Sequence, residues 1–263
     1  MQNTCFHHVR MHASIPWDFA LILFLLAVVV PWRGAVRVRQ LMRRDSLSTA
    51  DRLVLYASTI AFQWLATGVV LWRCVVHGYR PADLGLVIGR FWLSIAVMVA
   101  LSLLITANQL VSLKKLAGLP REKQGFFRAF SLKLMPQNST ERLAFFALVS
   151  TVAICEEIIY RGFIQRFFQN LSHGYALVGL VASAVFFSVA HLYQGRRGLV
   201  VAFFVGAVFS AIRIWTGSLA PTIVAHFVAD LAAGILGPVW LAEKTSAATS
   251  ALPSEITDSP RSA

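Results

Sequence analysis

Residues 143–162 read LAFFALVSTVAICEEIIYRG, an apolar run that ends in two adjacent carboxylates and an arginine. A carboxylate in such surroundings costs several kcal/mol unless it is paired, hydrated or neutralised. Glu157 and Arg161 lie four positions apart with the acid first, which is the favourable order for an ion pair along one helix face. Glu156 projects about 100° further around the helix and has no such local partner. The stretch therefore predicts one structurally neutralised carboxylate and one available carboxylate.

The whole chain has the composition of a membrane protein. Of its 263 residues, 57% are hydrophobic and only 14% are charged, with a mean hydropathy of +0.66, whereas a soluble domain carries about 25% charged residues. Seven apolar segments are long enough, or nearly so, to cross a bilayer core of about 30 Å. They are residues 15–32, 53–76, 91–107, 140–170, 175–192, 198–215 and 218–236. This pattern predicts an all-α, polytopic membrane helical bundle of about seven transmembrane helices.

The organisation along the chain follows from the same pattern. We expect N-terminal transmembrane helices and a basic amphipathic loop over residues 1–139, a transmembrane core over 140–241, and a disordered cytosolic tail over 242–263, which is rich in Ser, Thr, Ala and Pro. Within the first part, residues 108–141 interleave basic side chains with Leu and Phe. That mixture is typical either of an amphipathic segment on the lipid headgroups or of an ordinary cytosolic loop.

The net charge of +12 is spread over short basic segments between the apolar runs. Such placement indicates cytoplasmic loops and argues against nucleic-acid binding. The loops after the first, third and fifth segments carry most of the Lys and Arg, so we expect the N-terminus outside and the C-terminus in the cytosol of a multi-pass protein of the cell (inner) membrane. Arg166 and Arg213 are expected to snorkel to the interface. The three cysteines, Cys5, Cys74 and Cys155, show no CxxC spacing and predict no disulfide framework.

Ionisable residues inside the spans form three clusters. Besides the glutamate pair with Arg161, Phe187 precedes His191 by four positions and can wall its imidazole. His226 precedes Asp230 by four positions, so that carboxylate can hold the imidazole through an Nδ1–H bond. Each cluster alone is more often structural. Three helices that each present Glu or His, in a chain with almost no other buried charge, predict one shared functional site.

One glutamate and two histidines support two chemistries. Glu156 can act as a general base towards water, with the histidines orienting the water or stabilising an oxyanion. Alternatively, Glu156, His191 and His226 can bind a divalent metal, zinc above all, although the HExxH spacing is absent. In either case activated water attacks a carbonyl, most simply that of a peptide bond. The absence of GxSxG, Walker A and GxGxxG patterns counts against a serine hydrolase, an ATPase and a dinucleotide enzyme.

The three clusters in this order resemble the CPBP intramembrane proteases, which include type II CAAX prenyl endopeptidases and bacteriocin-processing or immunity proteins. The family pattern EExxxR, FxxxH and HxxxN or HxxxD is matched at residues 156–161, 187–191 and 226–230, and the stretch 83–86 is also similar. The resemblance covers residues 140–236. It implies that the four C-terminal helices, over residues 140–241, form the catalytic core, with a cavity that opens towards the cytosol. It implies that Glu156 activates water with His191 and that His226 and residue 230 hold the oxyanion. Glu157 and Arg161 would shape the site.

The resemblance leaves the metal and the role of Asp230 open. Family members are described as metalloproteases, and a metal-free glutamate mechanism has also been argued for them, so Zn²⁺ is one alternative. The prenyl-protein branch commonly has Asn where this chain has Asp230, and an ionised Asp cannot donate to an oxyanion. Asp230 is therefore protonated, or it orients His226, or it helps bind a metal. We favour orientation of His226.

The function expected from the sequence is an intramembrane endopeptidase. Its partners would be the lipid bilayer and a peptide or lipidated-protein substrate, with a prenylated CAAX-like protein as one candidate, and no nucleic acid. A non-enzymatic membrane immunity or partner-binding protein of the same fold is the alternative. A proton or small-ion transporter is less favoured, because no inverted repeat is seen.

Overall fold

The computed structural model describes residues 15–249, and the side chains of residues 15–242. This part of the chain is helical and contains no strand, so the predicted all-α class is confirmed. The α-helices are α1 (Trp17–Phe24), α2 (Val30–Arg43), α3 (Thr49–Val76), α4 (Phe91–Gly118), α5 (Arg121–Leu134), α6 (Ser139–Glu156), α7 (Gln165–Leu171), α8 (Ala176–Ala190), α9 (Gly195–Thr216) and α10 (Ala220–Thr249). Two π-helical segments, Leu25–Val29 and Glu157–Ile164, join α1 to α2 and α6 to α7, and a short 3-10 turn, Leu192–Gln194, precedes α9.

Six helical stretches among the described residues are long and apolar enough to cross a membrane. They are Trp17–Arg43, Thr49–Val76, Phe91–Gly118, Ser139–Leu171, Leu192–Thr216 and Ala220–Ala242, and the shorter apolar helix α8 lies between the fourth and the fifth. Large apolar side chains along them point away from the protein, as Trp92 does with 80% of its surface exposed. Such surfaces suit a lipid environment. The protein is an integral, multi-pass membrane protein.

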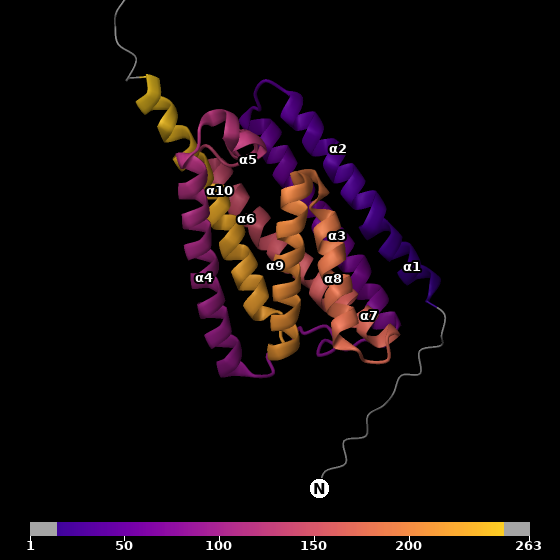
Figure 1. The fold of residues 1–263 in the computed structure, drawn as a ribbon. Helices are drawn as coiled ribbons and strands as arrows, with labels where there is room; N and C mark the ends of the chain where they lie inside the picture. Colours follow the sequence, from indigo (N-terminus) through magenta and orange to yellow (C-terminus); the bar gives the residue numbers. More distant parts are fainter. Residues whose placement is uncertain (1–14, 250–263) are drawn as a thin grey trace, which may run out of the picture.

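The Ser139–Leu171 stretch, called the central helix from here on, runs through the middle of the bundle and is the most buried of the six spans. Helices α3 and α10 both pack against α6, and α8 packs against α7 and α9. Figure 1 shows α4 beside α10 on one side of the bundle and α1 and α2 on the other. The central helix therefore touches elements from both halves of the chain, which is where a site built from several helices can form.

Two expectations about irregular segments are corrected. Residues 108–141 are not an ordinary loop, because α4 continues to Gly118 and α5 follows, broken at Gly125, whose φ of 53° glycine tolerates. The relation of α5 to the headgroups stays a prediction. The tail prediction is wrong for residues 242–249, which continue α10, because their Ala, Glu and Lys favour a helix. Residues 250–263 and Cys5 lie outside the described part of the chain.

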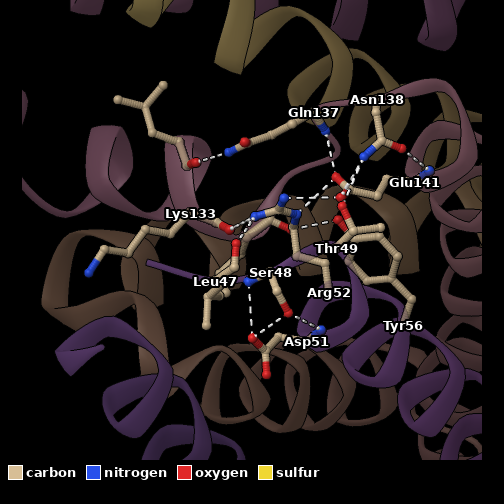
Figure 2. A network of polar contacts seen from close by, with 12 residues as sticks. Leu47, Ser48, Thr49, Asp51, Arg52, Tyr56, Lys133, Gln137, Asn138 and Glu141 are labelled. Carbon is tan, nitrogen blue, oxygen red and sulfur yellow. Dashed lines mark hydrogen bonds and ion pairs between the residues drawn. The ribbon is translucent and has the colours of Figure 1, made fainter. Parts of the chain in front are cut away.

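At one end of the bundle, a buried ion pair joins the start of α3 to the start of α6 (Figure 2). Arg52 donates from Nε and Nη2 to the two carboxylate oxygens of Glu141 at 2.8 and 3.0 Å. The side chains of these two residues are only 7% and 0% exposed. Asn138 caps α6 by accepting from the backbone N–H of Glu141, and its amide donates to the same carboxylate. This network fixes the N-terminal half of the chain to the beginning of the central helix.

At the other end of α3, the loop before α4 docks on the second half of the chain. Arg166 donates to the Asp83 carboxylate at 3.1 Å, and Arg213 donates to the Asp83 backbone carbonyl at 2.6 Å. Each of these two arginines therefore has an acceptor within the protein, and the expectation that they reach the membrane interface stays a prediction. Tyr79 of the same loop is buried, and burial raises the pKa of its phenol to about 12.

Candidate active site

The two adjacent glutamates lie where the central helix changes its winding. Glu156 is the last residue of α6, and Glu157 begins the π-helical segment Glu157–Ile164, in which every residue is buried. Short π-helical stretches within α-helices are rare and occur frequently at functional sites. Arg161 Nη1 donates to Glu157 Oε1 at 2.8 Å, and both side chains are fully buried. The predicted ion pair is confirmed.

Aromatic rings enclose the Arg161 guanidinium. Its Cζ atom lies 4.0 Å from the centroid of the Phe187 ring, on α8, and 5.3 Å from that of Phe209, on α9. A cation over a ring face is attracted by the ring quadrupole, and the attraction strengthens away from water. Through these two rings, α8 and α9 both contact the central helix at the ion pair of Arg161 with Glu157.

His226, on α10, is held by Glu157 and not by its helical neighbour. Its Nδ1 lies 3.1 Å from Glu157 Oε1, whereas the Asp230 carboxylate lies 3.6 Å from the other ring nitrogen, Nε2. The prediction that Asp230 holds Nδ1 is therefore wrong, because the packing of α10 on the central helix brings a second carboxylate to that nitrogen. Since an ionised carboxylate only accepts, Nδ1 carries a proton.

Glu156 is the glutamate that no arginine neutralises, as the sequence predicts. Its Oε1 accepts a hydrogen bond from Gln63 Nε2, on α3, at 3.1 Å. Its Oε2 is buried, has no hydrogen-bond partner among the residues that the structure describes, and lies 4.0 Å from His226 Nε2. The sequence analysis assigned no role to Gln63. The signal was present as an amide inside the apolar segment 53–76.

His191 follows the last residue of α8 and is oriented by that helix. Its Nδ1 lies 2.8 Å from the Phe187 carbonyl oxygen, and the two rings are 4.4 Å apart between centroids, which confirms the predicted wall. Because a carbonyl only accepts, Nδ1 carries the proton and Nε2 keeps its lone pair. The Phe187 ring also lies 6.0 Å from the His226 ring. Phe187 therefore sits between the two histidines.

The structure thus gathers the predicted residues into one cluster at the π-helical segment. Asp230 is its most accessible member, with 39% of its side chain exposed, whereas the Glu156 side chain is 15% exposed. No hydrogen bond joins His191 to Glu156 directly in the described part of the chain, so any cooperation between them runs through a bound water or substrate. The arrangement therefore places the Glu156 carboxylate, which no arginine neutralises, close to the Nε2 atom of the His226 imidazole.

The donor set was also tested against a metal ion. Within residues 15–242 no three His, Cys, Asp or Glu side chains are grouped so that they could hold one. Glu157 is occupied by Arg161, and only the Nε2 atoms of His226 and His191 are left as nitrogen donors, because acceptors engage both Nδ1 atoms. Since these donors are not grouped, the residues in this arrangement do not fit a metal centre.

Comparison with known proteins identifies the second half of the chain. Residues 138–232 match the family model described as type II CAAX prenyl endopeptidase Rce1-like. Searches of the curated proteins and of the solved structures returned no match. The matched range contains the central helix, both histidines and Asp230, in agreement with the order of motifs in the sequence. Residues 138–232 are therefore similar to the Rce1-like type II CAAX prenyl endopeptidases.

Proposed function

We propose that the protein is an intramembrane endopeptidase in which Glu156 activates the attacking water. One observation carries the proposal: Glu157 is occupied by Arg161 and His226, whereas Glu156 keeps Oε2 unpaired beside the His226 imidazole. The family match over residues 138–232 supports the reaction class. The substrate we propose is a membrane-associated protein, with a prenylated, CAAX-like C-terminus as the first candidate.

The reaction can be written with the residues present. Glu156 takes a proton from a water molecule as its oxygen bonds to the carbonyl carbon of the scissile peptide. The carbonyl electron pair moves to oxygen and forms a tetrahedral oxyanion. As the C–N bond breaks, the oxyanion collapses to the new carboxyl group, and the proton held by Glu156 passes to the leaving amine. No other reactant is needed.

The two histidines are proposed to serve different atoms. When His226 is protonated on both nitrogens, Glu157 holds Nδ1–H and leaves Nε2–H to donate to the oxyanion. The Asp230 carboxylate, 3.6 Å from Nε2, favours this imidazolium electrostatically. His191 has its Nδ1–H held by the Phe187 carbonyl, so its Nε2 can accept a hydrogen bond from the water and orient it.

The decisive experiment compares two glutamates. Purified protein in liposomes is given a farnesylated CAAX peptide, the same peptide without the lipid, and no peptide. We expect cleavage, and we expect Glu156→Gln to lower kcat at least about 100-fold, as the loss of a general base does. Glu122→Gln, at an exposed position of α5, is the matched control and should act like the wild type. Equal rates for the wild type and Glu156→Gln would reject the proposal, and binding without turnover would favour a partner-binding protein.

We propose a metal-free mechanism, because the donors do not group around a common point. The test measures the metal content of active protein and its activity after treatment with a chelator. We expect no stoichiometric zinc and unchanged cleavage. Loss of activity on chelation, with recovery on addition of Zn²⁺, would overturn this part of the proposal.

For the orientation, we propose that the loop between α2 and α3 faces the cytosol together with α5. Both lie at the same end of the bundle (Figure 1), and basic side chains are frequent in α5 and in the second half of α2, which leads to this end. Single cysteines at the exposed positions Ser46 and Ala82, in a chain without its native cysteines, test this in intact cells. A membrane-impermeant maleimide should label Ala82→Cys and not Ser46→Cys. The reverse pattern would invert the topology.

A further inference from the structure

We infer that Gln63 is a positioning residue for the reaction: its side-chain amide sets the rotation of the Glu156 carboxylate so that Oε2 faces His226. This inference rests on the proposed function. It concerns a residue of α3, which lies outside the range 138–232 matched by the family model. A part of the chain that the family comparison does not cover would then contribute to the chemistry.

The geometry is specific to one oxygen. Gln63 Nε2 donates to Glu156 Oε1 at 3.1 Å, across 93 positions of sequence. The other oxygen, Oε2, is left without a hydrogen-bond partner among the described side chains and lies 4.0 Å from His226 Nε2. The terminal torsion of a glutamate is broad and roughly two-fold, so a single fixed hydrogen bond decides which oxygen points where. Without the Gln63 amide, either oxygen of the Glu156 carboxylate could face His226.

The chemical nature of the donor matters as much as its place. An amide N–H is neutral, so it orients the carboxylate without cancelling its charge. The neighbouring Glu157 shows the alternative, because the Arg161 guanidinium binds it and takes it out of use as a base. The two adjacent glutamates thus differ in their partners: a cationic guanidinium binds Glu157, and a neutral amide binds Glu156. A general base must accept a proton, so a neutral hydrogen-bond donor suits it better than a cation.

A purely structural role is already filled by another contact. Trp64 follows Gln63 on α3, and its Nε1 donates to Thr151 Oγ1 on α6 at 3.2 Å. That hydrogen bond joins the same two helices and touches none of the site residues. Thr151→Val removes it with little change of shape, so it serves as the matched control for the loss of one α3–α6 hydrogen bond.

The experiment uses the full chain in liposomes with the farnesylated peptide and measures kcat, KM and the melting temperature. We expect Gln63→Leu to lower kcat about 10-fold or more and to leave KM within about twofold, since only the activation of water is impaired. Gln63→Met, which keeps the length of the side chain and loses the donor, should lower kcat by a similar factor. Thr151→Val should leave kcat and KM unchanged, and its melting temperature should match that of Gln63→Leu. Adding Gln63→Leu to Glu156→Gln should cause no further loss.

Each contrary result has a separate meaning. An active wild type with an unchanged kcat in Gln63→Leu would overturn the inference and leave the proposed function standing. Equal falls in kcat for Gln63→Leu and Thr151→Val would assign Gln63 to helix packing and overturn the inference as well. A wild type that cleaves neither peptide would reject the proposed function, and the inference would fall with it.

Discussion

The Nδ1 atom of His226 lies 3.1 Å from Oε1 of Glu157, so the imidazole is held by the central helix and not by a residue of its own helix. The same oxygen accepts from Arg161 at 2.8 Å. One carboxylate oxygen thus anchors both the guanidinium and the imidazole. Glu157 is a connection between α10 and the central helix, and its loss would affect folding as well as activity.

The first prediction separates the two adjacent glutamates by their effect on stability. Breaking a buried ion pair by removing one partner costs about 3–5 kcal/mol, because the other charge is left uncompensated. Glu157→Gln should therefore be strongly destabilised as well as inactive, whereas Glu156→Gln, whose parent is bound by no arginine, should lose activity with a cost below about 1.5 kcal/mol. Thermal unfolding of both variants in the same detergent checks this. Equal melting temperatures would contradict the assignment of roles.

A second prediction concerns Asp230. Because Glu157 holds Nδ1 of His226, Asp230→Asn should fold with an unchanged melting temperature. The asparagine amide can donate to an oxyanion, which an ionised carboxylate cannot. We expect peptide cleavage close to the wild-type rate, because the new amide donor offsets the loss of a carboxylate that favours the His226 imidazolium. A fall of about 10-fold or more, equivalent to about 1.4 kcal/mol of transition-state stabilisation, would show that the carboxylate is needed.

The third prediction uses the buried ion pair at the start of the central helix. Arg52→Met leaves the Glu141 carboxylate, which is fully buried, without its guanidinium, and should cost about 3 kcal/mol or more. The exposed pair of Arg44 with Asp51, whose side chains are 57% and 36% exposed, supplies the control, and Arg44→Met should cost less than about 1 kcal/mol. Chemical or thermal unfolding of the two variants gives the comparison. The double variant Arg52→Met with Glu141→Met should recover part of the loss, and failure to do so would point to a role of Glu141 beyond the pair.

The fourth prediction concerns the loop between α3 and α4, in which Asp83 contacts Arg166 and Arg213 of the second half of the chain. Gly85 has φ +72°, and a Cβ there would meet Leu219 Cγ at 3.3 Å and Arg213 Nε at 3.4 Å. Gly85→Ala should destabilise the protein by about 1–2 kcal/mol, the cost of a left-handed conformation for an L-residue. Gly89→Ala, in the same loop, meets nothing within 4 Å and should behave like the wild type. Similar melting temperatures for the two variants would show that the loop rearranges freely.

The sequence was sufficient for contacts within one helix. The pairing of Glu157 with Arg161 and the approach of Phe187 to His191 both follow from a spacing of four, and both are present. The partner of Nδ1 in His226 could not be predicted, because periodicity assigns faces within a helix and not the rotation of one helix against another. In a membrane this gap widens, since helices such as α3 are apolar on most sides and no polar stripe marks the face that turns inward.

Other contacts that the sequence did not reveal have the same origin. Arg166 and Arg213 both contact Asp83, which lies in a loop more than 80 positions earlier in the chain. Gln63 was visible as a polar residue in a span but had no partner within its own helix. Contacts at such separations are set by tertiary packing, which the local pattern of a single sequence does not encode.

Two of the hydrogen bonds between α3 and α6, from Arg52 to Glu141 and from Gln63 to Glu156, connect a helix of the first half of the chain to the range matched by the family model. The range matched by the family model, residues 138–232, is consequently smaller than the part of the chain that forms these contacts. An excised fragment of that length would retain every motif residue and still lack the arginine and the amide that its own glutamates require. Domain boundaries placed around the motifs alone would separate these buried glutamates from their partners on α3.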